Sequence, residues 1–591
     1  NITVNNQLRW KVIDGLQLVG QAVIRKYDQD ENVTNKKITN YDWDNNEVRE
    51  KRTPNSAERR YQKTLSKNFT LYADYKKNFN DRHDLSVMVG TSHESENYDR
   101  FTAKRINFDQ QENMSLQLGS AQDQNAWSEG NQWTINSFFS RVNYTFANKY
   151  VIEGTIRADG SSRFDPDHRW GWFPGVNAAW RVGEEGFMKR LGWFEDLKVR
   201  ASYGEMGNQS GIGLYDYIQL ISLSNDYYPF GAGVKGQMAT SGNIISTSRT
   251  WETIQTTNVG FDFSTLNNRL YGSFDYFWKE NKNMLIPKTY PSMLGADAPS
   301  TNSGHLSIHG WEISLGWRDQ IKDFSYSVRF NISDAKNKVV DRVGSNLIKL
   351  GNNETPTGYP LNSYFGYEFD GIIQNEQELE AYKSRFSEGG IPGDLSVGDA
   401  MYKDLDGDGK LSVLGDGKEG SGDVKYLGDK NPRYNFGFNL SMAWKGFDLS
   451  AFIQGVGRRT MFLEGESRCP MPEAWYQSAE YWYGKTWTPE RTDAQYPAIT
   501  LKDKRNYNYY VSTNTKFNVA YARLKNLQFG YTIPQTLTSK AGLQKVRVYF
   551  SGEDLFEVHN TPNGWDPEEN SGSITSYPFT RNYSFGINVV F

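Results

Sequence analysis

The sequence predicts an all-β fold that forms the wall of a transmembrane antiparallel β-barrel. Three observations predict it: apolar and polar residues alternate in many segments, short and long connections take turns between those segments, and the chain ends on an alternating aromatic segment. A period of two is typical of a strand with one apolar face. A barrel in a bilayer turns that face to lipid and the other to a wet lumen.

The C-terminal strand shows the pattern most clearly. Its apolar face carries Tyr583, Phe585, Ile587, Val589 and Phe591, and its other face carries Ser584, Gly586 and Asn588. An open sheet edge in lipid leaves backbone groups without hydrogen-bond partners. A sheet that ends on this strand is therefore expected to close with it.

Length and composition fit this class and exclude others. The chain has 591 residues, of which 37% are hydrophobic and 15% aromatic. No run of about 18 apolar residues occurs, so no transmembrane helix is predicted. The net charge of -4 shows no excess of basic residues of the kind that binds nucleic acid, so no nucleic-acid partner is expected. The single cysteine, Cys469, cannot form an internal disulfide.

Alternating segments follow one another along the whole chain. The first two flank Asp14-Gly15, a tight hairpin signal. In chain order, the alternating apolar positions are Leu8, Trp10, Val12; Leu16, Leu18, Ala22, Ile24; Phe69, Leu71, Ala73, Tyr75; Leu85, Val87, Val89; Val142, Tyr144, Phe146; Tyr150, Ile152, Ile156; Leu197, Val199, Ala201, Tyr203; Val259, Phe261, Phe263; Leu270, Phe274, Tyr276, Trp278; Trp311, Ile313, Leu315, Trp317; Phe324, Tyr326, Val328, Phe330, Ile332; Phe436, Phe438, Leu440, Met442, Trp444; Phe447, Leu449, Ala451, Ile453; Leu527, Phe529, Tyr531; and Val546, Val548, Phe550. This template gives about 17 strands.

The connections between these segments alternate in length. Short ones fall near 14–15, 78–83, 147–149, 183–194, 264–267, 319–323, 445–446 and 534–543. Long ones fall near 28–59, 101–130, 158–171, 207–252, 280–302, 336–431, 461–517 and 557–579. Outer-membrane barrels have short periplasmic turns and long extracellular loops. The sequence therefore predicts topology as well as fold class, with 336–431 and 461–517 as the longest extracellular loops.

Aromatic residues flank several of the short turns. The pairs are Phe146 and Tyr150, Trp317 and Phe324, and Trp444 and Phe447. These are the positions of an interfacial aromatic girdle. Core packing explains any single pair, but its repeat at successive short turns favours the girdle.

Strand parity indicates that part of the barrel precedes this chain. If the final strand ends in the periplasm, an odd count of about 17 strands places Asn1 outside the cell, whereas single-chain bacterial barrels have even counts. No signal peptide is visible, and Asn1 opens directly into strand-like sequence. Residues 1–591 are therefore expected to be the C-terminal part of a barrel. A full count of about 22 strands is typical of barrels with a plugged lumen.

The order and spacing of several motifs carry a family resemblance. They are Arg157-Ala-Asp-Gly-Ser-Ser-Arg-Phe164 with Trp170-Gly-Trp-Phe-Pro174; Leu197-Lys-Val-Arg-Ala-Ser-Tyr-Gly204 with Gly207-Asn-Gln209; Trp251-Glu252; Asn267-Asn-Arg-Leu270; Phe274-Asp-Tyr276; Asp404-Leu-Asp-Gly-Asp-Gly409; Phe447-Asp-Leu449 with Gln454-Gly455; Arg523-Leu-Lys-Asn-Leu527 with Gly530-Tyr-Thr-Ile-Pro534; and Asp566-Pro-Glu568. With these motifs, the chain resembles the C-terminal part of the SusC/RagA family of TonB-dependent outer-membrane transporters from Bacteroidota.

The resemblance implies a plugged barrel of about 22 strands. It implies import of a large nutrient, an oligosaccharide or a peptide, with energy supplied from the inner membrane through TonB. It also implies a SusD-like surface lipoprotein that closes over the barrel as a lid, and a dimer of transporter–lid pairs. The plug domain and the TonB-contacting segment are expected upstream of residue 1, because nothing in this chain matches them.

An acidic motif in the loop 336–431 predicts a cation site. Its candidate ligands are the carboxylates of Asp404, Asp406 and Asp408, the backbone carbonyl of Lys410, and Asp416 as the closing ligand. Carboxylates at i, i+2 and i+4 converge on one hard cation in the first half of an EF-hand loop, so Ca²⁺ is the expected ion. An acidic residue at loop position 12 would fall on Gly415, which leaves Asp399 as an alternative to Asp416. The other interpretation is a solvated acidic turn.

Aromatic clusters mark three long loops. They are Tyr227, Tyr228 and Phe230; Trp475, Tyr476, Tyr481, Trp482, Tyr483 and Trp487; and Tyr507, Tyr509 and Tyr510. Aromatic faces stack on sugar rings or anchor a protein partner. The predicted substrate or lid contacts are Tyr227, Tyr228, Trp475, Trp482, Tyr507 and Tyr509. Mutual packing that orders the loops is the alternative.

No enzymatic motif is found. The histidines are His83, His93, His168, His305, His309 and His559, and no HExxH or paired zinc spacing joins them. Walker loops and nucleophile elbows are missing as well. The chain is therefore predicted to be a transporter and not an enzyme.

The predicted function is TonB-dependent import across the outer membrane of a Gram-negative bacterium. One alternative keeps the architecture and makes the barrel the wall of a secretion or assembly machine. The other is a soluble, extracellular β-rich carbohydrate-binding protein, whose exposed strand faces would lack a lipid-facing apolar band.

Overall fold

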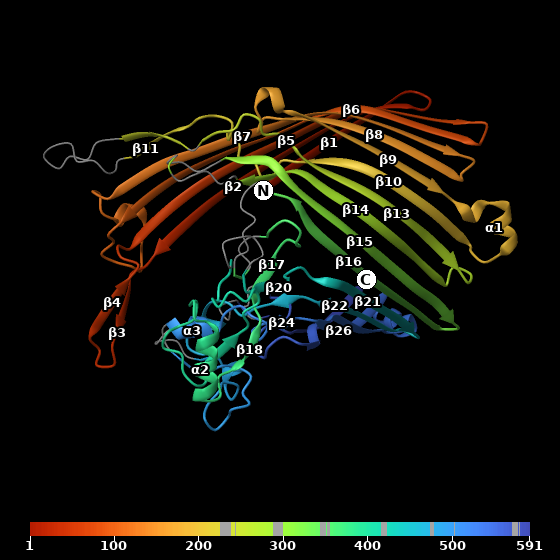
Figure 1. Ribbon diagram of the computed structural model, residues 1–591. Coiled ribbons are helices and arrows are strands. Elements are labelled where there is room, and N and C mark those ends of the chain that lie inside the picture. The colour runs from red at the N-terminus through yellow and green to blue at the C-terminus, as the bar shows by residue number, and fades with distance from the viewer. Residues whose placement is uncertain are drawn as a thin grey trace. The chain divides into compact units, whose positions relative to one another are not determined.

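The fold is described here from a computed structural model of the chain (Figure 1). The structure describes residues 1–224, 238–242, 244–287, 293, 299–342, 350–351, 355–414, 422–472, 478–500, 503–569, 577 and 579–591.

The main sheet has 17 strands, the number that the alternating segments predict. The strands are β1 (Ile2–Ile13), β2 (Leu16–Asn35), β5 (Ser56–Phe79), β6 (His83–Ile106), β7 (Gln124–Phe146), β8 (Tyr150–Ser161), β9 (Trp170–Trp180), β10 (Asp196–Asn208), β13 (Glu252–Thr265), β14 (Leu270–Pro287), β15 (Ser300–Ile321), β16 (Phe324–Asp341), β21 (Arg433–Trp444), β22 (Phe447–Arg458), β25 (Tyr521–Thr532), β26 (Lys545–His559) and β27 (Asn582–Val590). Chain neighbours pair antiparallel, as β1–β2 and β26–β27 do. Within the described residues no pairing joins β27 to β1, so closure of the sheet stays a prediction.

The connections hold small sheets and short helices. The paired strands are β3 (Ile38–Tyr41) with β4 (Glu47–Lys51), β11 (Ile221–Ser224) with β12 (Met238–Ser241), β17 (Ser363–Tyr367) with β20 (Val424–Asp429), β18 (Phe369–Ile372) with β19 (Ala400–Tyr402), and β23 (Thr460–Met461) with β24 (Phe517–Asn518). The helices are α1 (Gly186–Leu191), α2 (Glu376–Arg385), α3 (Asp503–Asn508) and α4 (Gln535–Thr538). Among the described residues no helix is long and apolar enough to cross a membrane.

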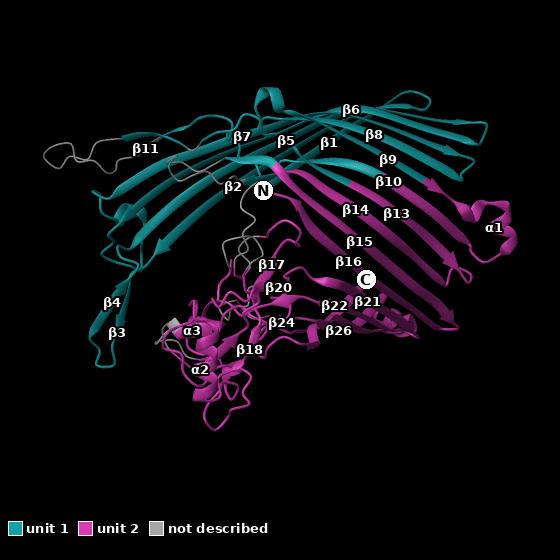
Figure 2. Ribbon diagram, in the orientation of Figure 1, with its two compact units in different colours: residues 1–178, 203–255, 285–302 teal, residues 179–202, 256–284, 303–591 magenta. Residues whose placement is uncertain are grey.

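The chain divides into two compact units, which Figure 2 colours separately. Unit 1 comprises residues 1–178, 203–255 and 285–302, and unit 2 comprises residues 179–202, 256–284 and 303–591. The same alternation of apolar and polar faces holds inside each unit.

One face of the sheet is apolar and exposed in both units. In unit 1, Ile152 and Ile156 of β8 are 52% and 45% exposed. In unit 2, Phe585 and Ile587 of β27 are 84% and 66% exposed. A soluble sandwich would bury these side chains against a second sheet. We call this the apolar face and the opposite one the polar face.

Aromatic pairs stand at the short turns, as the sequence predicts. Phe146 and Tyr150 stack in unit 1 with ring centroids 6.3 Å apart. Trp444 and Phe447 stack in unit 2 at 6.5 Å, and both rings are more than a third exposed. Because these rings remain exposed, the pairs match a girdle better than a buried core.

Four strands run further than predicted. The predicted loops 28–59 and 101–130 begin too early, because β2, β5, β6 and β7 continue for 20, 24, 24 and 23 residues. Their far ends carry cross-strand polar pairs such as Arg59 with Asp30 at 2.7 Å. A strand that leaves the bilayer meets water on both faces, so the apolar period that signals it disappears while the hydrogen-bonded ladder goes on.

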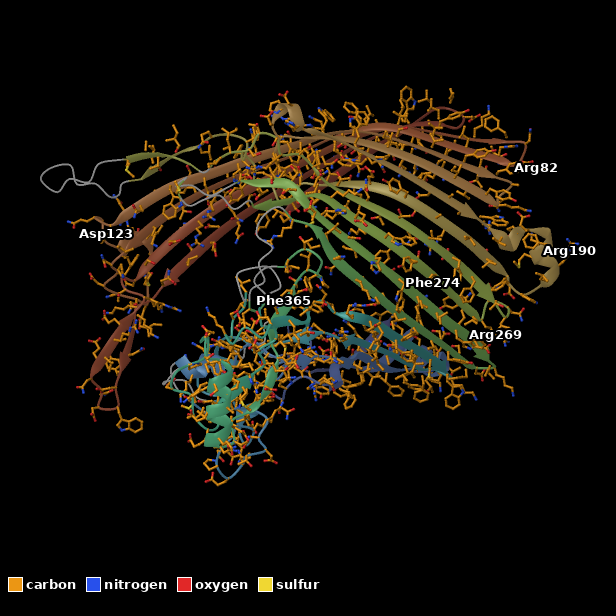
Figure 3. All side chains as sticks on the ribbon, in the orientation of Figure 1. Arg82, Asp123, Arg190, Arg269, Phe274 and Phe365 are labelled. Atoms are coloured by element: carbon orange, nitrogen blue, oxygen red, sulfur yellow. The ribbon has the colours of Figure 1, made fainter. Side chains whose placement is uncertain are left out.

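The buried core of unit 2 lies in the loops. It is formed by the described residues of 355–432, 459–520 and 560–569, which we call the loop core. Phe365 of β17, labelled in Figure 3, is 1% exposed there. Tyr402 of β19 and Tyr496 are fully buried. The loop core packs aromatic side chains inward, as a soluble domain does.

Candidate functional site

Charged side chains cover the polar face of unit 2 at membrane-spanning positions. Arg200 of β10 donates to Asp262 of β13 at 3.1 Å and to Asp275 of β14 at 2.7 Å. A side chain at Gly260 would lie 2.6 Å from the Asp275 carboxylate, so glycine leaves space for this network. The three charged residues alternate with the apolar positions of their strands, which places them on the wet side.

A second cluster lies on the last strands of unit 2. Arg547 of β26 donates from Nε to Asp448 of β22 at 2.9 Å and from Nη2 to Gln528 of β25 at 3.0 Å. Gly530 leaves space for this guanidinium group, because a Cβ at Gly530 would lie 2.5 Å from it. The side chains span three neighbouring strands, so the polar face of the sheet carries fixed polar groups.

Unit 1 has the same kind of lining. Glu153 of β8 accepts hydrogen bonds from Asn143 of β7 and Asn177 of β9, both at 3.2 Å. Arg157 pairs with Asp159 at 2.7 Å and donates to Ser137 at 2.8 Å. Such groups can bind polar solutes by exchanging hydrogen bonds with them.

Several family motifs meet in one cluster of unit 1. Phe164, Phe173 and Trp251 form a buried aromatic group, with Phe164 and Trp251 ring centroids 5.1 Å apart. Trp251 donates its indole N–H to the carbonyl of Arg169 at 2.8 Å. A Cβ at Gly207 would lie 2.2 Å from the Phe173 ring, so this position requires glycine. The motifs are therefore structural and hold the long connections against the strand ends.

Two further motifs meet in unit 2. Arg523 of β25 is 2% exposed and forms ion pairs with Asp566 at 2.5 Å and Glu568 at 3.0 Å. Lys525 adds a pair with Glu568 at 3.2 Å. Breaking a buried pair by removing one partner leaves an uncompensated charge, so this network fastens the segment 560–569 to the sheet.

The predicted aromatic contacts that can be located lie inside the loop core. Trp482, Tyr507 and Tyr509 are 3%, 1% and 2% exposed. Tyr507 hydrogen-bonds through its hydroxyl to that of Tyr382 at 2.7 Å, and burial raises the pKa of Tyr382 to about 12. The three side chains thus follow the packing alternative. The other predicted contacts, Tyr227, Tyr228 and Trp475, lie outside the described residues.

The acidic loop brings together a set of carboxylates that differs from the predicted one. Oxygens of Asp404, Asp406 and Asp423 lie within 4.8 Å of one another. Desolvation raises the pKa of Asp406 and of Asp423, and neighbouring carboxylates raise both further. A divalent cation would neutralise this cluster with the oxygen ligands that Ca²⁺ prefers.

The other predicted metal ligands have different contacts or lie outside the described residues. The Asp408 carboxylate accepts the backbone N–H of Lys410 at 2.8 Å and does not belong to the cluster within the described residues. Asp399 is buried and accepts from Ser396 at 2.8 Å. Asp416 lies outside the described residues.

Asp423 is the residue that the sequence motif missed. It is fully buried and accepts the backbone N–H groups of Leu405 and Ser412, both at 2.7 Å. It thereby holds the two ends of the acidic loop together from the start of β20. Ligand spacing rules cover one continuous loop, so they give no signal for a residue that returns from a later strand.

The comparisons with known proteins agree with this geometry. The family model described as "TonB dependent receptor-like, beta-barrel" matches residues 3–555. The chain is 31% identical over 558 residues to TonB-dependent receptor P3 of Formosa agariphila, covering 89% of this chain and 52% of that protein. It is 26% identical over 568 residues to TonB-dependent receptor SusC of Bacteroides thetaiotaomicron, covering 88% and 50%.

Among solved structures, the fold is similar to that of the RagAB peptide transporter. The TM-score is 0.80 at 22% identity, covering 99% of this chain and 61% of that chain. The chain spans about half the length of the curated relatives it matches. This chain therefore belongs to the TonB-dependent receptor-like β-barrel family.

Proposed function

We propose that this chain forms the larger part of the wall of an importer that carries a large nutrient, an oligosaccharide or a peptide, across the outer membrane of a Gram-negative bacterium. One observation carries the proposal: the same strands present an exposed apolar face and a polar face with fixed ion pairs, such as Arg200 with Asp262. That arrangement suits a wall between lipid and a wet lumen. The substrate passes without covalent change.

The proposal includes two protein partners. TonB would act through a plug domain contributed by sequence before residue 1, and a SusD-like lipoprotein would close over the long loops. The similarity to the TonB-dependent receptor SusC and to the RagAB peptide transporter supports this part of the proposal. The buried aromatics of the loop core would serve the lid by holding its docking surface in shape. Tyr227, Tyr228 and Trp475 remain the candidates for direct contact.

The test uses the full-length protein and its deletion strain. Wild-type cells are expected to take up one class of labelled oligosaccharide or peptide, and the deletion strain is expected to lose that uptake. Removal of TonB or collapse of the proton gradient should abolish uptake as completely as the deletion. Uptake that persists in the deletion strain while a surface protein fails to appear would instead favour a secretion or assembly machine.

We also propose that Asp404, Asp406 and Asp423 hold a Ca²⁺ ion that stiffens the acidic loop. The supporting observation is that carboxylate oxygens of the three residues lie within 4.8 Å of one another. Calcium is expected to slow protease cleavage of residues 404–414 in the full-length protein, and Asp423→Asn should abolish the effect. Asp408→Asn is the matched control, because Asp408 stands outside the cluster. Equal protection of both variants by calcium would contradict the site.

A further inference from the structure

The apolar face of unit 1 carries a groove of about 750 Å³. Its floor is formed by Gly20 and Ala22 of β2, and its walls include Leu8 of β1 and Phe69 and Leu71 of β5. A Cβ at Gly20 would meet nothing within 4 Å, so the space above the floor is open. Because neighbouring strands lie about 4.8 Å apart, the walls on β1 and β5 stand roughly 10 Å apart, which admits one extended hydrocarbon chain.

The register fixes the depth of this groove in the bilayer. The row Leu8–Gly20–Leu71–Thr91–Phe138 crosses β1, β2, β5, β6 and β7. The next row on the same face, which is further from the short turns, is Asn6–Ala22–Phe69–His93–Asn136. Phe69 is about ten residues from the short-turn end of β5, roughly 24 Å for a strand tilted by about 45°. The apolar band of a barrel is about 25 Å tall. The groove therefore lies at the extracellular edge of the hydrocarbon.

Polar groups mark the same boundary. His93 Nδ1 and Asn136 Oδ1 are 2.7 Å apart on the apolar face, beside the groove. A polar pair at the centre of the bilayer is costly, whereas the headgroup level tolerates one. The other row of groove residues, one step closer to the short turns, holds Leu8 and Leu71, so the change from apolar to polar side chains occurs within the groove itself.

A positive charge stands one step beyond this boundary. Lys67 of β5 lies opposite Ile24 and Ser95 on the apolar face, and its side chain is exposed. It makes no ion pair within the described part of the chain. Lys26, one step further out on β2, is already paired with Asp28 at 2.8 Å. Lys67 is thus a cation at headgroup level without a protein counter-charge.

We propose that this groove binds a lipopolysaccharide molecule of the outer leaflet, with one acyl chain over Gly20 and Ala22 and a phosphate beside Lys67. An apolar slot ending at an unpaired ammonium group is complementary to a phosphorylated lipid in both shape and charge. The inference is independent of what the barrel transports. It assigns a lipid site to a face that otherwise serves only as the boundary with bulk lipid.

The test measures lipopolysaccharide retained by the full-length protein after extraction and exchange into detergent. Mass spectrometry of its hydroxylated fatty acids is expected to give about one molecule per barrel. Gly20→Phe fills the groove and should lower retention about tenfold. Gly154→Phe is the matched control. Gly154 lies on the apolar face of β8, outside the groove, and a Cβ there would also meet nothing within 4 Å. Heat-modifiable gel mobility verifies that each variant folds.

The charge is tested separately. Lys67→Gln should lower retention about fivefold, and Lys63→Gln, further from the groove on the same strand, should not. Equal retention by the Gly20→Phe and Gly154→Phe variants would overturn the proposal. Loss of lipid from all four variants would show an adventitious additive only and overturn it too. A change in oligomeric state by light scattering for Gly20→Phe, with lipid unchanged, would assign the groove to a second copy of the chain.

Discussion

The main sheet and the loop core use the same aromatic residues in opposite ways. Trp444 and Phe447, on the sheet, are 51% and 41% exposed, whereas Trp482 and Tyr507, in the loop core, are 3% and 1% exposed. The sheet turns its apolar side chains outward because lipid is its solvent there. The loop core turns them inward because it stands in water. Burial within the chain therefore identifies which solvent each region meets.

The two regions should fail independently. The strands satisfy their backbone hydrogen bonds in the ladder, and the loop core is held by its own aromatic clusters. Damage to the loop core is expected to leave the sheet folded, and damage to the apolar face is expected to lower the stability of the sheet in lipid.

The largest effect is expected from Tyr507→Ala in the loop core. It removes a ring that is 1% exposed and a hydroxyl that bonds to Tyr382, so the local free energy of unfolding should fall by about 3–5 kcal/mol. Limited proteolysis should then cut the loops faster while the heat-modifiable barrel band persists. Tyr483→Ala is the control, because Tyr483 is 89% exposed and its loss should change stability by less than about 0.5 kcal/mol. Loss of the barrel band in Tyr507→Ala would contradict independent failure.

A smaller effect is expected on the sheet, where two adjacent residues of β22 separate the faces. Ala451 lies between Leu440 and Leu527 on the apolar face, and Ser450 lies between Ser441 and Gln528 on the polar face. Ala451→Arg should lower the free energy of unfolding in lipid vesicles by about 2–4 kcal/mol, whereas Ser450→Arg should have little effect. Urea titration of both variants checks this. Equal destabilisation would mean that the faces are assigned wrongly.

The same contrast explains how much the sequence could predict. Alternation of apolar and polar residues identifies a strand where one of its faces meets lipid. The 17 strands and their short turns therefore follow from positions such as Phe447, Leu449 and Ala451. It stops working where β2 and β5 leave the bilayer, so their outer ends, residues 28–35 and 56–59, were predicted as loop. The boundary of the alternating pattern is therefore the boundary of the membrane and not the end of the strand.

The candidate sites were predictable to different degrees. The aromatic clusters of the loops were visible in the sequence, but their burial was not, because inward packing of Trp482 and Tyr509 depends on chain segments that meet only in three dimensions. Asp423 was missed for the same reason. The polar-face pairs, such as Arg547 with Asp448, carry a usable signal: a charged residue at an alternate position within a membrane-spanning strand.

The stability of the acidic loop should change with pH in the direction opposite to that of ordinary acid denaturation. The pKa values of Asp406 and Asp423 are raised above the ordinary 3.8 by burial, so the native loop binds protons more tightly than the unfolded one. Its stability in chelator should therefore fall as the pH rises above about 3.8. The rate of protease cleavage of residues 404–414 measures this stability. Excess calcium should remove the dependence, and a loop that is stabilised by rising pH without calcium would contradict the assigned shifts.

The smallest effect is expected from Arg547→Gln on the polar face. The pair with Asp448 is partly solvated, with side chains 15% and 37% exposed, so its loss should cost only about 0.2–1 kcal/mol in urea titration. The variant leaves a carboxylate on the wall without its counter-charge, so uptake of anionic substrates should fall relative to neutral ones of the same size. Lys540→Gln, in the short connection between β25 and β26, removes the same charge away from the wall and should leave that ratio unchanged. A loss of stability comparable to that of Ala451→Arg would mean that Arg547 supports the fold, and the polar face would then resemble the loop core more than a wet lumen.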